Sequence, residues 1–252
     1  MKYTPRQFTT ALVLVAALIL GGCGAPVNRS VGDGIKAALP GVVGTADSWD
    51  VDVTGNPGTI IGGHIPGVIV HGVNVHVSPQ MTMAHLDITA TDVYVDVRKR
   101  ELKRIGSLTF AGVLTQEELD SYLRATAPTS KGRPDDFKIT LNDHDLSLSF
   151  SQKIASFHIP VKVAGRLNVS RHGDDKIDFM PSKLAIASVP IPKKLIDYAA
   201  DAINPAIDLS SLSFPVHLDN IHVSGQRVMF SGGAEIPKSA FEAAQQQVSN
   251  VR

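Results

Sequence analysis

The chain has 252 residues, of which 43% are hydrophobic, enough for one large domain or two small ones with a substantial core. It carries 24 basic and 24 acidic residues, so a basic surface for binding nucleic acid is not indicated. Its single cysteine excludes an intramolecular disulfide and a thiolate metal cluster.

Residues 1–22 have the pattern of a secretory signal peptide. Lys2 and Arg6 give a positive start, and the apolar run ALVLVAALIL that follows is too short to span a membrane. The sequence LGGC, which ends at Cys23, resembles a bacterial lipobox, in which the cysteine is lipid-modified and becomes the first residue after cleavage. We therefore expect lipidation of Cys23, with an incidental cysteine as the alternative, and a tether over residues 23–30. Such a protein is exported and lies at the outer face of the bacterial cytoplasmic membrane or in the periplasm.

A helix and a strand are predicted next. The helix covers residues 31–39 and is ended by Pro40-Gly41. In the strand, over residues 49–54, the apolar side chains share one face and the acidic side chains share the other, with Trp49, Val51 and Val53 against Asp50 and Asp52. One face of this strand is expected to join the core.

The glycine-rich stretch 55–79 predicts a strand at the entrance of a curved sheet. Its last part alternates strictly, with one face formed by Val73, Val75 and Val77 and the other by Asn74 and His76. Residues 68–70 are apolar on both faces, so the strand passes from a covered region to a solvated edge. Gly72 would allow a bulge between the two parts.

Residues 83–97 predict one long strand whose buried face switches. The apolar residues keep one parity from Leu86 to Ala90 and the opposite parity from Val93 to Val97. A bulge near Thr91-Asp92 inside a single twisted strand explains this pattern with the fewest assumptions.

The densest charge in the chain is the basic run RKRELKR, residues 98–104. One interpretation is a solvated turn between strands. The other is a contact to anionic lipid headgroups, where each basic group near the surface contributes about 1 kcal/mol. The candidate headgroup contacts are Arg98, Lys99, Arg100, Lys103 and Arg104. The sequence alone does not decide between the two.

A strand over residues 105–114 leads into a helix. Thr115 and Glu118 have the spacing of a capping box, and the apolar residues Leu119, Tyr122 and Leu123 fall on one helix face. A loop over residues 127–136 is expected to follow.

The second half of the chain predicts antiparallel strands and one further apolar helix. Residues 137–141 and 146–150 form a hairpin, and strands over residues 157–169 and 176–187 follow with no room for crossover helices. The segment KKLIDYAADAI, residues 193–203, predicts a helix that is apolar around much of its circumference and therefore lies inside the protein. The remaining predicted elements are strands at 214–218, 221–223 and 228–230 and a short peripheral helix at 237–248.

Motifs for catalysis are absent from the sequence. It has no G-x-S-x-G, H-E-x-x-H, G-K-[ST] or C-x-x-C pattern. The closest set of histidines is His64, His71, His76 and His85, and the alternation puts His71 and His76 on opposite faces of their strand. We therefore predict no catalytic residue, no metal site and no cofactor.

Four segments resemble the LmeA-like phospholipid-binding proteins of the bacterial envelope. They are residues 63–75, the run LDITATDVYVD at 86–96, the helix segment at 114–123 and the sequence INPAIDL at 203–209. The resemblance covers about residues 30–235. It implies an α+β fold like that of the tubular lipid-binding (TULIP) superfamily, in which a long, strongly curved antiparallel sheet wraps an apolar helix, with two or three further short helices. The implied domain covers residues 31–236, and residues 237–252 form a tail.

The resemblance also implies a groove for acyl chains, and the missing catalytic motifs predict no enzymatic activity. The residues expected to line it are Ile61, Val68, Val70, Phe110, Leu119, Leu123, Leu195, Tyr198, Ala199, Ala202 and Ile203. The expected partners are a phospholipid or related lipid and the membrane reached through Cys23, with no nucleic acid and no identified protein partner. The alternatives are a structural or assembly lipoprotein with a collapsed core and, disfavoured by the missing motifs, an envelope hydrolase or transferase.

Overall fold

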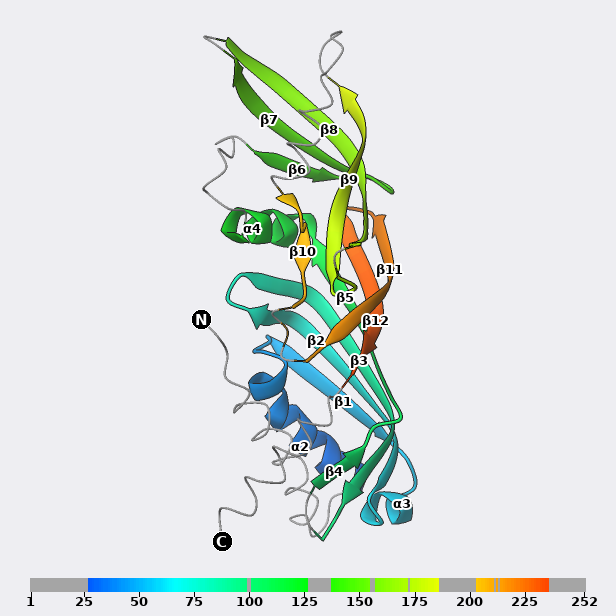
Figure 1. The fold of residues 1–252 in the computed structure, drawn as a ribbon. Coiled ribbons are helices and arrows are strands. Elements are labelled where there is room, and N and C mark those ends of the chain that lie inside the picture. The colour runs from blue at the N-terminus through cyan, green and yellow to red at the C-terminus, as the bar shows by residue number, and fades with distance from the viewer. Residues whose placement is uncertain are drawn as a thin grey trace, which may run out of the picture.

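The computed structural model describes residues 27–98, 101–126, 137–154, 157–171, 173–185, 203–210, 212 and 214–235. Several predictions concern other residues: the signal peptide, Cys23, the loop at 127–136, the helix up to residue 202 and the helix at 237–248. In the described part, antiparallel strands dominate and form two sheets (Figure 1). The predicted α+β class with a strongly curved antiparallel sheet is confirmed, and the strands divide into two groups.

Sheet A, the seven-stranded sheet, combines the first strands of the chain with the last. Its order is β1-β2-β3-β5-β12-β11, with β4 paired to β3. The bounds are β1 Ser48–Thr54, β2 His64–Ser78, β3 Met81–Asp96, β4 Glu101–Arg104, β5 Ser107–Thr115, β11 Val216–Ser224 and β12 Arg227–Ala234. Because β12 pairs with β5, the C-terminal hairpin completes a sheet that the N-terminal half began.

Sheet B, the five-stranded sheet, follows the order of the sequence. Its order is β10-β9-β8-β7-β6, with β6 Lys138–Leu141, β7 Leu146–Ile154, β8 Phe157–Val169, β9 Lys176–Ala185 and β10 Ile207–Asp208. The predicted hairpin is confirmed, since Leu141 pairs with Leu146 and Lys138 with Ser149. Neighbouring strands are antiparallel throughout.

Helix α2, Val27–Val42, is longer at both ends than the sequence predicted. Pro40 does not end it. Proline lacks the N–H that would donate to the carbonyl four residues earlier, but Pro40 lies in the last turn, so this hydrogen bond is lost only near the end of the helix. The helix also takes in residues 27–30 of the predicted tether. Asn28 fixes this first turn to sheet A, since its Nδ2 donates to the carbonyl oxygens of Val53 at 3.0 Å and Gly55 at 3.1 Å.

Helix α4, Gln116–Thr126, lies between the two sheets (Figure 1). Its predicted capping box is confirmed. The Glu118 carboxylate accepts from the Thr115 amide at 2.7 Å, and the Thr115 hydroxyl accepts from the Glu118 amide at 3.3 Å. The predicted apolar face is also confirmed, because Leu119, Tyr122 and Leu123 are all buried.

In each of the two long strands of sheet A, one change of the buried face coincides with a left-handed residue. In β3 the change occurs at Asp92, with φ +50°, as the sequence predicted. In β2 it occurs at Asn74, with φ +51°, and not at Gly72. Val73 is therefore exposed while Val75 is fully buried, so the prediction that they share a face is wrong. Gly72 has another role, since a Cβ there would lie 2.4 Å from Cζ3 of Trp49.

Candidate functional site

The apolar interior is continuous from sheet A through α4 to sheet B. Six of the predicted groove residues belong to it, and none is more than 6% exposed: Val68, Val70, Phe110, Leu119, Leu123 and Ile203. In sheet A, Val70 lies opposite Ile88 and Ile88 opposite Phe110, so these side chains share one face across three strands. Phe110 also meets the edge of Phe230, with ring centroids 6.4 Å apart.

Ile61 does not join these residues. Its place in the stretch 55–79 predicted a strand residue, but Ile61 ends the short helix α3, Pro57–Ile61, and is 59% exposed. Its neighbour Ile60 is fully buried, so α3 uses Ile60 to attach to the core and leaves Ile61 outside. The other predicted groove residues, Leu195, Tyr198, Ala199 and Ala202, lie outside the described residues.

Helix α4 is connected to sheet B as well as to sheet A. The hydroxyl oxygen of Tyr122 accepts a hydrogen bond from the amide of Asp208 in β10 at 3.1 Å. Burial raises the pKa of Tyr122 above its ordinary value, so the phenol stays neutral. The Gln116 side chain accepts from the amide of Leu141 in β6 at 2.9 Å. The helix therefore carries its buried leucines at the junction of the two sheets.

The basic run is not a simple turn. Glu101–Arg104 forms β4 beside β3, and Val97 and Arg98 lie in a turn directly after β3. Lys103 Nζ lies 3.6 Å from Asp96 Oδ2, and the Arg104 guanidinium carbon lies 4.5 Å from the centre of the Tyr94 ring. Arg98 is exposed in the turn, whereas Lys99 and Arg100 lie outside the described residues.

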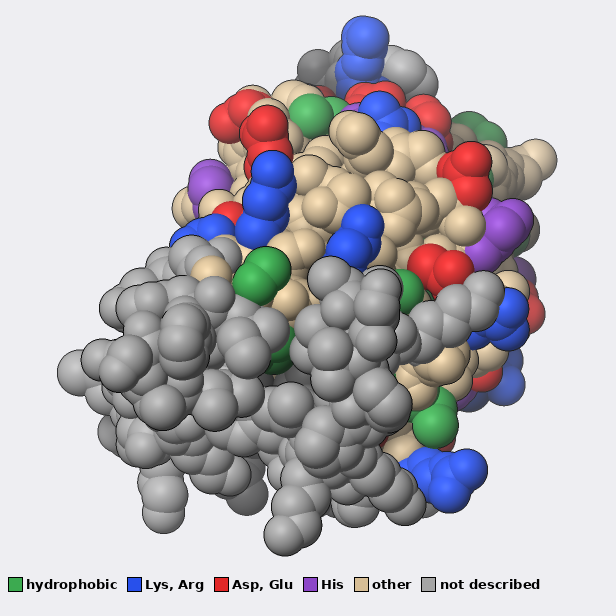
Figure 2. All heavy atoms as spheres, turned by 90° about the horizontal axis from the view of Figure 1, so that it is seen from above, with side chains coloured by type: hydrophobic (Ala, Val, Ile, Leu, Met, Phe, Trp, Pro, Cys, Tyr) green, Lys and Arg blue, Asp and Glu red, His purple; other side chains and the backbone are tan. Residues whose placement is uncertain are grey.

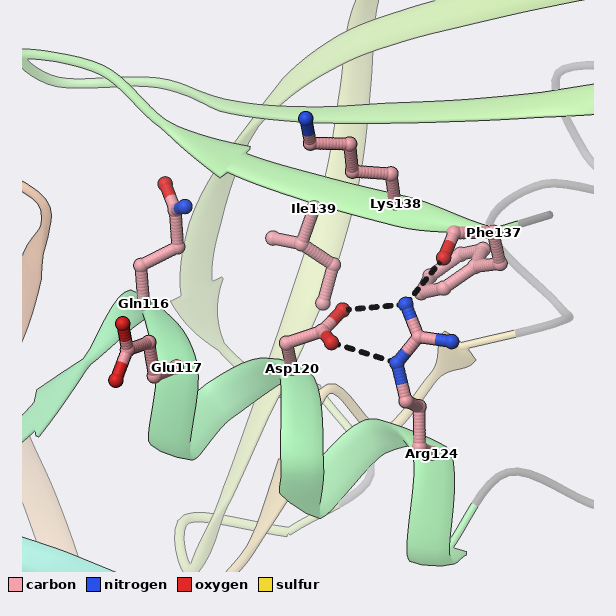
Figure 3. A pocket seen from close by; sticks show the side chains of 7 residues that line it. All are labelled: Gln116, Glu117, Asp120, Arg124, Phe137, Lys138 and Ile139. Carbon is pink, nitrogen blue, oxygen red and sulfur yellow. Dashed lines mark hydrogen bonds and ion pairs between the residues drawn. The ribbon is translucent and has the colours of Figure 1, made fainter.

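A cavity of about 380 Å³ opens beside α4, on the side of β6 (Figure 3). Five of its seven lining residues are polar or charged, and none belongs to the predicted groove: Gln116, Glu117, Asp120, Arg124, Phe137, Lys138 and Ile139. Arg124 binds Asp120 through Nε at 2.6 Å and donates from Nη2 to the carbonyl oxygen of Phe137 at 2.6 Å. This arrangement fastens α4 to the start of β6. The i,i+4 spacing could have revealed the Asp120–Arg124 pair, but nothing in the sequence indicated the hydrogen bond from Arg124 to the Phe137 carbonyl.

The strand histidines are paired with polar neighbours. His71 Nδ1 lies 2.7 Å from Asp87, and His76 Nδ1 lies 2.7 Å from the Thr82 hydroxyl. Both histidines are exposed because the buried face switches at Asn74, so their predicted placement on opposite faces is wrong. Over the described ranges, no group of three or more His, Cys, Asp or Glu side chains could hold a metal ion. No helix in that part of the chain is long and apolar enough to cross a bilayer.

The model of one protein family, LmeA-like phospholipid-binding, matches residues 27–233. The chain belongs to the LmeA-like phospholipid-binding family. The matched range begins with α2 and ends in β12, so it includes both sheets and α4. Searches of curated proteins and of solved structures gave no match.

The segments that suggested the LmeA-like family have structural roles. Gly63, at φ +89°, accepts from the Val95 amide at 2.7 Å, and a Cβ there would lie 2.1 Å from the Val95 carbonyl oxygen. Asn204 in the INPAIDL segment binds the backbone of Phe179 twice, accepting from its amide at 2.7 Å and donating to its carbonyl at 3.0 Å. This clamp fixes the buried Ile203 beside β9.

Proposed function

We propose that the protein is an exported lipoprotein, anchored through a lipid-modified Cys23, that holds or passes phospholipid-type molecules in an apolar groove. The observation that carries the proposal is its membership of a phospholipid-binding family over residues 27–233. Burial of ten methylenes of an acyl chain would contribute roughly 8 kcal/mol, at about 0.8 kcal/mol each. The tails would therefore set the affinity, and the headgroup contacts would set a preference.

The proposed groove follows the apolar layer that contains Val70, Phe110 and the buried leucines of α4. Support comes from the continuity of this layer between the sheets, since an acyl chain needs a long apolar path. The helix predicted over residues 193–203 would form the opposite wall in this proposal. A charged group placed on the layer would oppose an acyl chain, because an unpaired buried charge or polar group costs about 2 kcal/mol or more.

A structural lipoprotein is the second candidate. The tight burial of the same six residues favours it, since a solid core would also leave them at most 6% exposed. In that case the curved sheet would serve as a rigid body for envelope assembly and would admit no lipid.

Native mass spectrometry of the full-length protein, extracted from its own membranes, tests the proposal. We expect bound phospholipid with the wild type, less with Val70→Asp, and an unchanged amount with the matched change Val73→Asp at an exposed site of the same strand. Thermal unfolding of each variant shows whether the loss reflects unfolding. Wild-type protein that carries no lipid would favour the structural candidate.

Anchoring is tested separately by membrane fractionation. Cys23→Ala should leave the protein unprocessed at the lipobox and without an attached lipid, which intact-mass measurement detects. Wild-type protein that has the mass of the unmodified chain, with or without residues 1–22, would exclude lipidation.

A further inference from the structure

One end of sheet A presents an exposed segment without charge. Residues 55–63, GNPGTIIGG, contain no charged side chain, and they include α3. Ile61 is the most exposed of the three large hydrophobic side chains that stand out in the described residues, the others being Val73 and Met180. An apolar side chain held outward on a rigid, uncharged turn is suited to enter the interfacial region of a bilayer.

The backbone of this segment largely satisfies itself. Asn56 Oδ1 accepts from the Gly58 amide at 2.9 Å, and the Thr59 hydroxyl donates to the Asn56 carbonyl at 2.7 Å. The Gly62 amide donates to the Gly58 carbonyl at 3.1 Å. These bonds lower the cost of removing water from the segment, because unpaired backbone groups are expensive to bury.

Basic side chains are held beside this segment. The bond from the Val95 amide to the Gly63 carbonyl ties the β3–β4 hairpin to the end of α3, and Figure 1 shows both at the same end of the sheet. His64, Tyr94 and Arg104 form one row across three strands. The Tyr94 ring stacks on His64 at 4.4 Å and carries the Arg104 guanidinium at 4.5 Å. An arginine held by an aromatic face keeps its N–H groups for phosphate oxygens.

The acidic groups at this end only partly offset the basic ones. Asp92 lies 3.2 Å from His64, and Asp96 lies 3.6 Å from Lys103. Glu101 is a third acid at this end, and Arg98 and Arg104 are exposed. Residues 92–104 contain five basic and three acidic side chains in the sequence, an excess of two positive charges. Among the described side chains that Figure 2 shows at the opposite end of the molecule, acidic and basic groups are interspersed. An anionic surface is therefore the complementary partner for the α3 end.

The start of the described chain lies at the same end. Asn28 is bonded to the carbonyl of Gly55, directly before α3. Asn28 is the fifth residue after Cys23 in the sequence, so the two lie about 17 Å apart at most, at about 3.5 Å per residue. A lipid on Cys23 would thus hold the α3 end close to the membrane.

We propose that the α3 end of sheet A docks on an anionic phospholipid bilayer, with Ile61 entering the interface and Arg98 and Arg104 contacting phosphate groups. The proposal rests on the proposed function, because docking would bring the apolar interior to the membrane that supplies or receives the lipid. Anchoring alone would attach the chain, whereas docking at this end gives the body a fixed orientation.

Site-directed labelling tests the docking. Protein that begins at residue 24, and so lacks Cys23 and the apolar run of residues 11–20, receives one new cysteine, Ile61→Cys or the control Met180→Cys. Each chain then has a single thiol for an environment-sensitive fluorophore. Met180 is a suitable control because it is also an exposed apolar residue but lies in sheet B. With vesicles of phosphatidylcholine and phosphatidylglycerol, we expect nitroxide-bearing lipids to quench the label at 61 and leave the label at 180 unaffected. Equal behaviour of the two labels overturns the proposal.

The charge contribution is tested with the same labels. Arg98→Gln and Arg104→Gln should each lower partitioning onto vesicles that contain phosphatidylglycerol by roughly fivefold, and leave partitioning onto phosphatidylcholine alone unchanged. The control Arg166→Gln, an exposed arginine of sheet B, should have no effect. An equal loss on both kinds of vesicle would overturn the attraction to a net anionic surface, because phosphatidylcholine also carries a phosphate group.

The outcomes separate this proposal from the proposed function. Wild-type protein without bound lipid would contradict lipid carriage, even if the label at 61 enters the bilayer. Bound lipid together with equal quenching at 61 and 180 would contradict the docking proposal and would leave lipid carriage uncontradicted. Ile61→Asp should abolish docking and keep the lipid that native mass spectrometry detects, because Ile61 lies outside the buried layer.

Discussion

The two sheets are assembled from the chain in different ways. In sheet B each strand from β6 to β9 pairs with its neighbour in the sequence, so its contacts are local. Sheet A is complete only when β11 and β12, from the far end of the described chain, pair beside β5. Local pairing has a small loop-closure cost, whereas distant pairing must offset a larger one. We therefore expect sheet B to gain structure before sheet A is closed.

The junction between the sheets makes separate unfolding costly. Besides the contacts of α4, the His144 amide in the β6–β7 turn donates to the Val223 carbonyl at 3.1 Å, and the Leu218 amide donates to the Asp174 carbonyl at 2.8 Å. These bonds join turns of sheet B to β11 of sheet A. The two sheets are therefore assembled differently but depend on each other in the folded protein.

The largest effect is expected from Leu119→Ala in α4. Leu119 is fully buried at the junction, and truncation of a buried leucine costs about 2–5 kcal/mol. Amide hydrogen exchange measured at increasing denaturant concentration should show a similar loss of amide protection in both sheets. Val73→Ala, at a residue 36% exposed, should change stability by less than about 0.5 kcal/mol. Loss of protection in one sheet only would show that the sheets are independent units.

A smaller effect is expected at two glycines, one in each sheet. A Cβ at Gly232 would lie 1.8 Å from the His217 carbonyl oxygen, and a Cβ at Gly165 would lie 2.3 Å from the Met180 carbonyl oxygen. Each glycine lies beside a register shift, so the strand must move to accept alanine. We expect Gly232→Ala and Gly165→Ala each to lower the free energy of unfolding by about 1–3 kcal/mol.

The control for these substitutions is Gly58→Ala. This glycine is in α3, and a Cβ there would meet only Asn56 Oδ1 at 3.4 Å. Alanine should be neutral or slightly stabilising there, because it restricts the unfolded chain. Equal destabilisation at all three sites in denaturant titrations would mean that the carbonyl contacts are not the cause.

The same contrast explains what the sequence could predict. The hairpins of sheet B and the cap of α4 depend on residues close together in the chain, so alternation and the Thr115–Glu118 spacing were sufficient. The insertion of β12 beside β5 depends on distant residues and had no local signal. The face switch at Asp92 was visible because apolar residues lie on both sides of it. The switch at Asn74 was hidden because Val73 is apolar although exposed.

The candidate site was predicted in the same uneven way. Burial of Val70, Phe110 and Leu119 follows from their patterns, since apolar periodicity identifies the face of an element that joins the core. The exposure of Ile61 was not predicted, because Ile60 and Ile61 are identical side chains and only the helix geometry of α3 decides which one is buried. The contact of Arg104 with Tyr94 depends on the register of β4, which the sequence did not indicate.

Tyr122→Phe should have a moderate effect on the link between α4 and sheet B. It removes the oxygen that accepts from the Asp208 amide, and one such bond contributes about 0.5–1.5 kcal/mol. Burial raises the pKa of Tyr122 above 10.0, so its stabilising neutral form is fully present below the pKa of the unfolded chain and is lost as pH rises through the folded value. Wild-type stability should therefore fall above about pH 10 more steeply than that of Tyr122→Phe in denaturant titrations.

The smallest effect is expected on the exposed face of sheet A, at His71. Its hydrogen bond with Asp87 raises the pKa of the imidazole, and the charges of Asp50 and Asp52 act in the same direction while desolvation opposes them. Because the folded pKa is raised above 6.5, this contribution to stability is present below that pH and is lost as pH rises through the folded pKa. His71 and Asp87 are about half exposed, so solvent screening limits the contribution to about 0–1 kcal/mol.

NMR titration should show a lower His71 pKa in Asp87→Asn, with a smaller gain in stability on acidification from pH 8 to about 6. The matched change Asp145→Asn, which removes an acid of sheet B that lies 3.8 Å from Arg166, should leave the titration of His71 unchanged. A His71 pKa that is the same in the wild type and in Asp87→Asn would show that the pair across β2 and β3 does not control its protonation.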